Sequence, residues 1–388
     1  MKIFLSFLQS KLQHQIPAYS FWEYYIKNGI EETGYNWVEE KSIDWAFGLT
    51  IKTEKELNAW KANVWEKTIF YIKNNPVDLF LSYLYPFQID NQAILEIQKL
   101  GIPCVNFFCD NVREFNTTPK EFAIFDLNWV PEYKALNIYR KANISNIHLP
   151  MPMWVDPSLR NISSKISNKI TFIGSKDTQR QLLFNDLFSK FPEFNLEIYG
   201  SGWLEKGREF ELQAENSYTF LDKIKFQYNF IKRNRLLAYI RKIKQRNFNP
   251  PINEILLDHL RGKVSFEKYI DLSKNSAITL GINRYPSFQF PIHQPNTYSR
   301  LRDIEAPMLG ACYLTEWTEG IEEMYDIGKD IEVYRNIEEL IEKSKEILRD
   351  NEKAKSMRIN GQKKALYQHS IKNSLLVIVN NLNIKASC

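Results

Sequence analysis

The sequence predicts an α/β protein built from two Rossmann-like domains, each with a doubly wound parallel sheet. Two observations support this fold class. Short buried apolar runs alternate with helical patterns along both halves of the chain, and such alternation is typical of parallel sheets. A break at Pro150, Pro152 and Pro157 separates the two series. The 388 residues leave room for two domains, since one domain usually takes about 100–200 residues.

In the first half, apolar runs predict strands at residues 2–7, 77–84, 103–109, 127–130 and 147–150. Helical patterns fall between them at residues 20–32, 54–73, 91–100 and 132–142. A further helix is expected to begin at Thr118, because Pro119 and Glu121 are favoured residues of a first helical turn.

In the second half, strands are predicted at residues 170–173, 196–199, 277–282, 311–315 and 330–334. Helices are predicted from the end of the first of these strands to about residue 188, and at 268–275, 336–349, 352–367 and 371–382. A long helical insertion ends at Pro250 and Pro251. We therefore expect domains at 1–165 and 166–370, with the insertion at about 204–260 and a last helical segment at 371–388.

The bulk composition narrows the class of protein. No apolar run approaches the ~20 residues that cross a bilayer, and the N-terminal run is too short for a signal peptide. None of the four cysteines belongs to a CxxC motif, which predicts reduced thiols and a cytoplasmic location. These cysteines are Cys104, Cys109, Cys312 and Cys388. The Asn/Lys/Ile-rich composition is typical of an AT-rich bacterium.

The net charge of +5 is concentrated in one segment. Residues 217–250 carry nine Lys and Arg and one Asp, a local balance of +8, so the remainder is about −3. A local basic segment argues against a general nucleic-acid binder, and no nucleic-acid partner is expected.

Ligands of parallel sheets bind outside the carboxyl ends of the strands, which directs attention to the loops there. Gly174, Ser175 and Lys176 follow the first strand of the second half, with Arg180 one turn on. The glycine lets the backbone come close to a ligand, and the helix N-terminus offers free N–H groups. With the two cations, these features suit the binding of a diphosphate. The alternative is a tight turn with a solvated lysine.

The next strand ends in a glycine-rich turn. Gly200 and Gly202 permit close approach of a ligand, and Trp203 is a candidate to stack on a flat base. The alternative is that Trp203 packs against the insertion.

The segment 300–334 contains an acidic helix start, a buried strand, a second acidic loop and another strand. Glu305 opens the helix and Gly310 closes it. This arrangement resembles the nucleotide-sugar site of GT-B glycosyltransferases, most closely the group-1-like branch with the CgeB-type spore-maturation proteins. The resemblance implies two domains facing across a cleft, a nucleotide-diphosphate sugar as donor, and a C-terminal helix that crosses back to the first domain.

The resemblance also implies a role for Glu305 in binding the ribose hydroxyls of the nucleotide. The alternative is a favourable charge in the first turn of a helix. Arg300 and Arg302 either reach the phosphates or pair with Asp303. Among the later acidic residues, Glu319, Glu322 and Glu323 match a loop of the family that is usually structural, and a sugar contact is the second possibility.

One departure from the family pattern is visible. The family's Glu-x7-Glu motif has its first Glu eight positions before the second, and here that position is Thr297. Asn283, Arg284 and His293 lie in the preceding loop and are candidates to take over donor contacts; for His293 a surface or capping role is as plausible.

Candidate catalytic residues come from the first half. His14 follows the first strand, and Asp110 ends the strand near Pro103. A base from this domain deprotonates the acceptor hydroxyl in inverting GT-B enzymes. The alternatives are a partly buried histidine and a loop-capping aspartate. No Asp-x-Asp and no His-x-x-His spacing is present, so neither a metal nor a cofactor is expected.

The basic segment has a helical face of Leu236, Ile240 and Ile243 among cations and aromatics. It suits an anionic membrane surface or a lipid-linked acceptor, and the alternative is a docked helical hairpin with a solvated charged face. The sequence thus predicts a hexosyltransferase that moves a sugar, most plausibly from a UDP donor, to a glycan, lipid-linked or protein acceptor in bacterial surface-glycan synthesis. A UDP-sugar 2-epimerase and a non-catalytic binder of membranes or polyanions are the alternatives.

Overall fold

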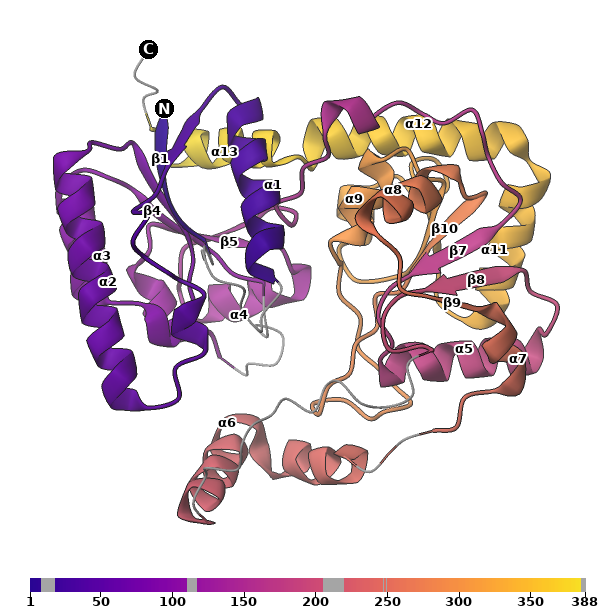
Figure 1. Ribbon diagram of the computed structural model, residues 1–388, viewed down its shortest axis with the longest axis horizontal. Coiled ribbons are helices and arrows are strands. Elements are labelled where there is room, and N and C mark those ends of the chain that lie inside the picture. Colours follow the sequence, from indigo (N-terminus) through magenta and orange to yellow (C-terminus); the bar gives the residue numbers. More distant parts are fainter. Residues whose placement is uncertain (8–17, 110–116, 205–219, 247, 249, 385–388) are drawn as a thin grey trace. The chain divides into compact units, whose positions relative to one another are not determined.

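The computed structural model describes residues 1–7, 18–109, 117–204, 220–246, 248 and 250–384 (Figure 1). The chain forms two compact units. The first comprises the described residues of Met1–Arg113, Thr117–Val155 and Tyr367–Cys388, and the second contains Asp156–Leu366. Each unit holds one six-stranded sheet in which every pair of neighbouring strands is parallel.

The sheet of the first unit has the strand order β2-β1-β3-β4-β5-β6. Its strands are β1 (Lys2–Phe7), β2 (Asn36–Val38), β3 (Leu79–Tyr83), β4 (Cys104–Phe107), β5 (Leu127–Val130) and β6 (Asn146–His148). The edge strand β2 was not predicted from the sequence, because its three half-exposed or exposed residues show no apolar run. The order reverses between β1 and β3, as in flavodoxin-like sheets.

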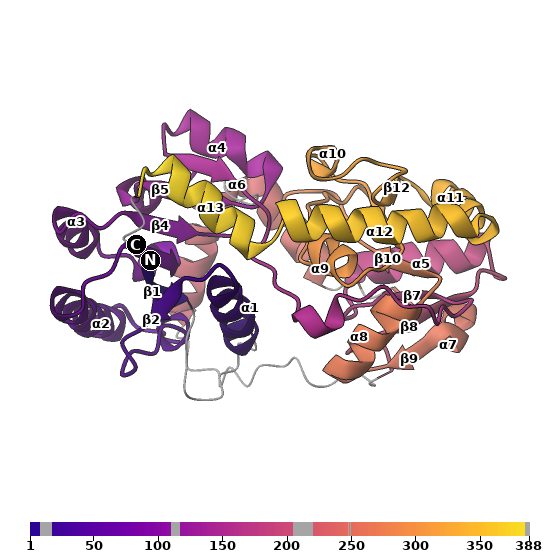
Figure 2. The same ribbon diagram turned by 90° about the horizontal axis from the view of Figure 1, so that it is seen from above.

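Helices cover both faces of this sheet. They are α1 (Ala18–Glu32), α2 (Glu54–Asn74), α3 (Asn91–Lys99), α4 (Leu136–Lys141) and α13 (Ile371–Asn381). Figure 2 shows α2 and α3 on one face and α1 and α13 on the other. Gly29 of α1 lies directly against Ile371 of α13, where a Cβ would come within 2.6 Å of the isoleucine side chain. The last helix of the chain is therefore part of the first unit's core packing.

The helix expected to begin at Thr118 is not an α-helix. Residues Lys120–Ile124 form a 3-10 helix with Pro119 at its N-cap and no side-chain cap. The chain has to be back in the sheet by Asp126, whose N–H donates to the carbonyl of Cys104 at 3.0 Å. Too few residues remain for a multi-turn α-helix, so the favourable first-turn residues produce only a tighter turn.

The sheet of the second unit has the order β12-β11-β10-β7-β8-β9. Its strands are β7 (Ile170–Ile173), β8 (Leu196–Tyr199), β9 (Leu260–Gly262), β10 (Ile278–Gly281), β11 (Tyr313–Glu316) and β12 (Glu332–Tyr334). This is the dinucleotide-fold order, with the reversal between β7 and β10. The edge strand β9 escaped sequence prediction for the same reason as β2: it is short and only its first residue is buried.

The helices of this unit are α5 (Thr178–Lys190), α6 (Phe220–Arg246), α7 (Glu254–His259), α8 (Phe266–Asn275), α9 (Arg302–Met308), α10 (Ile321–Met324), α11 (Ile337–Arg349) and α12 (Asn351–Gln368). In Figure 1, α8, α9 and α12 lie on one face of the sheet and α5 and α7 on the other. Phe172, Phe184, Leu187, Leu314 and Leu340 belong to the apolar core under α5 and α11.

Arg358 of α12 is a buried charge that joins three parts of the second unit. Its Nη1 donates to the carbonyl oxygens of Lys274 at 3.0 Å and Gly310 at 3.1 Å. Its Nη2 donates to the carbonyls of Ser276 and Ala277. Burial lowers the pKa of this guanidinium. These carbonyls follow or end α8 and α9, so one side chain satisfies the free acceptors of two helix ends.

Arg358→Met keeps much of the side-chain length and removes the donors. Because four carbonyls lose their partner, in three buried hydrogen bonds and one part-buried one, we expect the free energy of unfolding to fall on the order of 3 kcal/mol, measured by urea unfolding. Arg349→Met, at the exposed end of α11, is the matched control and should change stability little. An equal loss in the two variants would contradict the role given to Arg358.

Candidate functional site

The reversal of strand order in the second unit brings two loops together. β7 and β10 are hydrogen-bonded neighbours, and the chain leaves their carboxyl ends in opposite directions, toward β8 and toward β11. A crevice at such a point is where open α/β sheets bind ligands. The two loops are 174–177, which precedes α5, and 282–301, which precedes α9.

The loop after β7 is tied to the loop after β8. The Ser201 hydroxyl donates to the Ser175 hydroxyl at 2.9 Å, and the Lys176 N–H donates to the Ser201 carbonyl at 2.9 Å. Gly200 has a φ of 138°, and a Cβ there would lie 2.2 Å from the Gly174 carbonyl oxygen. Gly200 is thus required by contact between two loops; the sequence had suggested a ligand contact.

Trp203 supports the same loop from inside the domain. Its side chain is 3% exposed, its Nε1 donates to the Gly174 carbonyl at 2.8 Å, and its ring packs against Phe184 at 5.7 Å between centroids. Stacking on a nucleotide base needs an open ring face, so the structure favours a packing role for Trp203. Trp203 belongs to the apolar core under Gly174, which also contains Leu256 and Leu260 from the segment 204–260; packing against that segment was the alternative to base stacking.

Arg180 lies in the first turn of α5 beside this loop. Its Nη1 donates to the Ser175 carbonyl at 2.6 Å, and its Nε pairs with Asp177, the N-cap of α5, at 3.3 Å. The pKa of Arg180 is lowered to about 10, first by burial and then by the positive charges of Arg300 and Arg302; Asp177 opposes the shift. The guanidinium groups of Arg300 and Arg302 therefore act on that of Arg180. We call Arg180, Arg300 and Arg302 the arginine cluster.

Arg300 and Arg302 reach the cluster from the start of α9. The Arg300 Nη2 donates to the Arg284 carbonyl at 2.9 Å, and its guanidinium lies over the Tyr298 ring, 4.8 Å from the centroid. Arg302 lies over the ring of Tyr269 at 4.9 Å. Aromatic faces attract cations, so the two rings help to hold both guanidinium groups in place.

Asp303 was a possible partner for Arg300, and the structure gives its carboxylate other bonds. It accepts from the Tyr313 hydroxyl at 2.8 Å, the Thr315 hydroxyl at 2.9 Å and the backbone N–H of Arg300 at 3.0 Å. Burial raises the pKa of Asp303, and these hydrogen bonds oppose the rise. Asp303 therefore fixes the backbone at the start of α9 to β11.

Arg284 is held by a residue to which the sequence gave no role. Glu316, the last residue of β11, accepts from the Arg284 Nε at 2.8 Å and from the backbone N–H groups of Asn283 and Arg284 at 3.1 and 2.9 Å. This buried carboxylate shapes the loop after β10. Its sequence signal is a polar residue at the carboxyl end of a predicted strand.

Thr297 takes part in the same local structure. It forms an antiparallel bridge with Arg284, and next to it the Tyr298 N–H donates to the Asn283 carbonyl at 3.1 Å. The loop thus returns on itself before α9. His293 lies apart from the cluster, in a hollow of about 390 Å³ whose wall also includes Arg284 and residues of α5 and α11.

Glu305 is 6% exposed and accepts a hydrogen bond from the hydroxyl of Tyr269 in α8. Burial raises the pKa of Tyr269, and the Glu305 carboxylate adds to the rise. The phenol therefore stays protonated and donates to Glu305. Tyr269 was missed in the sequence because nothing in a single tyrosine marks a partner 36 positions away.

His14 and Asp110 fall outside the described residues, so their catalytic roles stay predictions. Glu322 accepts from Trp317 Nε1 at 2.9 Å and pairs with Arg335 at 3.5 Å, which agrees with a structural role for this loop. Glu319 and Glu323 are exposed.

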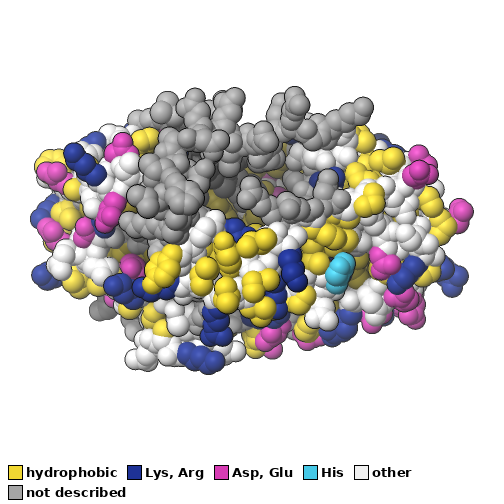
Figure 3. All heavy atoms as spheres, turned by 90° about the horizontal axis from the view of Figure 1, so that it is seen from below, with side chains coloured by type: hydrophobic (Ala, Val, Ile, Leu, Met, Phe, Trp, Pro, Cys, Tyr) yellow, Lys and Arg dark blue, Asp and Glu magenta, His cyan; other side chains and the backbone are white. Residues whose placement is uncertain are grey.

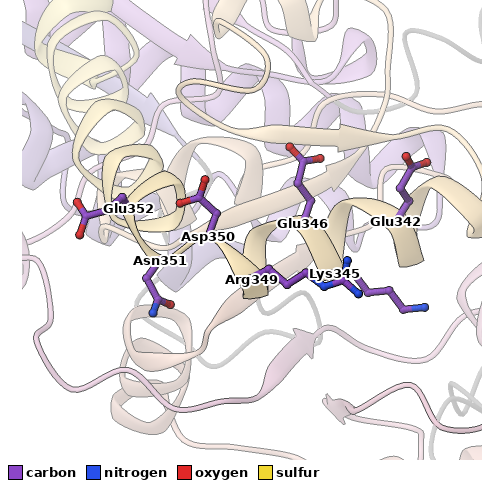
Figure 4. A pocket seen from close by; sticks show the side chains of 7 residues that line it. All are labelled: Glu342, Lys345, Glu346, Arg349, Asp350, Asn351 and Glu352. Atoms are coloured by element: carbon purple, nitrogen blue, oxygen red, sulfur yellow. The ribbon is translucent and has the colours of Figure 1, made fainter.

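A second hollow, of about 820 Å³, lies where α11 meets α12. Figure 4 shows the side chains that line it: the carboxylates of Glu342 and Glu346 point to one side, and Lys345 and Arg349 to the other. These charged groups do not converge on a shared point. The hollow therefore has the character of open surface between two helices.

The residues that the structure describes contain neither a metal-binding group of side chains nor a membrane-spanning helix. Among them, no group of three or more His, Cys, Asp or Glu side chains is arranged to hold a metal ion; metal independence of the protein stays a prediction. In the same part of the chain, we find no helix with the length and apolar character needed to span a bilayer.

Comparison with solved structures identifies the fold. A glycosyltransferase from Rickettsia africae ESF-5 superposes with a TM-score of 0.59 at 12% identity, covering 99% of both chains. Sucrose-phosphate synthase from Thermosynechococcus elongatus gives 0.57 at 10%, covering 98% of this chain and 99% of that one. HepE from Anabaena, solved in complex with UDP-glucose, gives 0.54 at 11%, with 98% and 99% covered. The two parallel six-stranded sheets are those of GT-B glycosyltransferases.

The sequence agrees with the fold. The model of the family described as glycosyl transferase-like matches residues 179–379, which is just over half of the chain. The chain therefore belongs to the glycosyl transferase-like family. A search among curated proteins gave no match.

Gly200→Ala tests the contact between the loops after β7 and β8. The added Cβ would lie 2.2 Å from the Gly174 carbonyl oxygen, so we expect thermal unfolding to show a loss of roughly 2 kcal/mol or more. Gly101→Ala is the matched control, because Gly101 also has a positive φ, 80°, and nothing lies within 4 Å of its Cβ position. Equal losses at the two positions would show that conformational strain alone explains Gly200.

Proposed function

We propose that this protein transfers a sugar from a nucleotide-diphosphate sugar, with UDP as the nucleotide, to a hydroxyl acceptor. The observation that carries the proposal is the arginine cluster at the strand-order reversal of the second unit. Burial and the charges of Arg300 and Arg302 lower the pKa of Arg180, and a dianionic group that enters beside these cations stabilises their charged forms. The UDP-glucose complex of HepE, a protein with the same fold, supports a uridine nucleotide.

The proposed contacts to the donor fall into two groups, one at the diphosphate and one at the ribose. Gly174, Ser175 and Lys176 form the loop next to Arg180: the Ser175 backbone N–H and the Lys176 cation are the proposed phosphate contacts, and burial lowers the pKa of Lys176. The arginine cluster supplies the charge that offsets the diphosphate as it leaves, a role that needs no metal ion. We retain Glu305 as the ribose ligand: Tyr269 orients the carboxylate, and each of its oxygens can accept more than one hydrogen bond.

Three residues that the sequence marked as candidate donor contacts take an indirect role in this proposal. Glu316 holds the Arg284 side chain. The Arg284 carbonyl accepts a hydrogen bond from Arg300, so Arg284 helps to orient Arg300. Gly200 and Trp203 hold the loop of Gly174 in place. The acceptor base is proposed to be Asp110 or His14 of the first domain.

The setting of the reaction belongs to the same proposal. A cytoplasmic hexosyltransferase of the CgeB-like branch, acting in bacterial polysaccharide or glycoconjugate synthesis, agrees with the sequence pattern. The local charge of +8 in residues 217–250 supports a peripheral location at an anionic membrane surface. The acceptor is proposed to be a glycan, lipid-linked or protein hydroxyl.

One observation favours a second candidate, a non-catalytic binder. Thr297 stands where the family pattern has its first Glu, and it is engaged in a backbone bridge with Arg284. Thermal shifts with UDP, GDP, ADP and CMP separate the candidates: stabilisation by none of them would favour the non-catalytic binder. Interconversion of UDP-sugars without transfer to an acceptor would indicate the remaining alternative, a 2-epimerase.

Glu305→Ala removes the proposed ribose ligand. A charge-assisted hydrogen bond contributes about 1.5–3 kcal/mol, so we expect the dissociation constant of UDP to rise roughly 10- to 150-fold, measured by isothermal titration calorimetry. Glu319→Ala, on an exposed loop, should bind UDP like the wild type. A Glu305→Ala protein that folds normally and binds UDP with wild-type affinity would refute the ribose role.

A further inference from the structure

Helix α6 changes direction at Arg235, whose backbone has φ 68° and ψ 161°. A positive φ is unfavourable for a residue with a side chain and persists where surrounding contacts hold it. The bend divides the helix into a first half, 220–234, and a second half, 236–246. The two halves can therefore present different faces to the rest of the unit.

The second half docks on the unit through polar groups. Arg241 donates to the carbonyl of Gln289, and the Gln245 Nε2 donates to the carbonyl of Ser287 at 3.4 Å. At the end of the first half, the Asn234 Oδ1 accepts from the Gln289 Nε2 at 3.0 Å. Within the second half, the buried Ala238, Arg241 and Gln245 recur every three or four residues and so form one stripe of the helix.

The opposite stripe is aliphatic and faces solvent. It consists of Leu236, Leu237, Ile240 and Ile243, which are 59%, 58%, 42% and 54% exposed. A helix on the surface of a globular protein normally turns its apolar stripe toward the core. Here the orientation is reversed, and four adjacent aliphatic side chains lie open. Figure 3, which views the molecule from the side of α6, shows hydrophobic side chains gathered among Lys and Arg side chains.

The charge around this stripe indicates what covers it. Lys232, Arg235 and Lys244 are exposed, and Asp222 is the only acidic residue between positions 217 and 250. A second copy of the chain would bring the same positive charge against it. Aliphatic side chains beside exposed cations match the interface of an anionic bilayer, where acyl chains lie next to negative headgroups.

We propose that the second half of α6 lies in the plane of an anionic membrane surface, with Leu236, Leu237, Ile240 and Ile243 inserted among the acyl chains and with Lys232, Arg235 and Lys244 at the headgroups. This inference deepens the membrane contact of the proposed function and is independent of the donor site. The polar stripe keeps the helix attached to the loop 282–301 while the aliphatic stripe enters the lipid.

The test is sedimentation of the full chain with vesicles of phosphatidylcholine alone and of phosphatidylcholine mixed with phosphatidylglycerol. Wild-type protein should bind the mixed vesicles, and Ile240→Asp/Ile243→Asp should lower the partition coefficient at least tenfold, since each aliphatic side chain loses most of its apolar transfer. The control Leu257→Asp/Leu348→Asp replaces two similarly exposed leucines of α7 and α11 and should bind like the wild type.

The contribution of the positive charges to vesicle binding is tested by a second double variant and its control. Each Lys near an anionic surface adds about a fivefold factor, so Lys232→Gln/Lys244→Gln should weaken binding roughly 20-fold. Lys263→Gln/Lys355→Gln removes two exposed lysines elsewhere and should have little effect. Equal binding to neutral and mixed vesicles would contradict the headgroup role.

Two further outcomes would overturn the proposal. One is unchanged vesicle binding by folded Ile240→Asp/Ile243→Asp. The other is a wild-type dimer, seen by light scattering, that this variant converts to a monomer, because the stripe would then be covered by a second copy. UDP affinity, measured on the same preparations, keeps the two proposals apart: UDP binding without vesicle binding sinks the membrane contact alone, and vesicle binding without UDP binding sinks the donor site alone.

Discussion

The mutual repulsion of Arg180, Arg300 and Arg302 is the constraint on which the second unit depends. Burial, and after it the charges of Arg300 and Arg302, lower the pKa of Arg180, so keeping this guanidinium charged costs free energy in the absence of an anion. Local groups offset part of that cost: Asp177 pairs with Arg180, carbonyls of Ser175 and Arg284 accept hydrogen bonds, and aromatic rings lie under the other two. An entering diphosphate would remove much of the remaining repulsion, which makes the cluster a prepared anion site.

Two buried carboxylates keep the backbone of that site in place. Glu316 binds the N–H groups of the loop after β10, and Asp303 binds the start of α9 to β11. Neither is proposed to touch a ligand. Each carboxylate accepts hydrogen bonds in the interior, where a charge without hydrogen bonds would be costly. Each therefore stabilises one arrangement of the loop from which Arg300 and Arg302 extend.

The sequence predicted the fold class, but it did not reveal the contacts that individual residues make. Strands at 170–173 and 196–199 agree with β7 and β8, because buried parallel strands read as uninterrupted apolar runs. Gly200 and Trp203 received ligand roles, yet both serve the Gly174 loop. Glu316, Tyr269 and Arg358 received none. Their partners lie far away in the chain, and no local pattern reveals a contact between distant residues.

The loop 282–301 joins the two proposals physically, since it carries Arg284 and Arg300 and also receives the polar stripe of α6 through Ser287 and Gln289. The central claim, however, is that the arginine cluster binds a diphosphate. Calorimetric titration of the wild-type protein with uridine, UMP and UDP tests it most directly. The account predicts that affinity rises steeply with each phosphate and that the gain for UDP falls with salt. Equal affinity for uridine and UDP would contradict it.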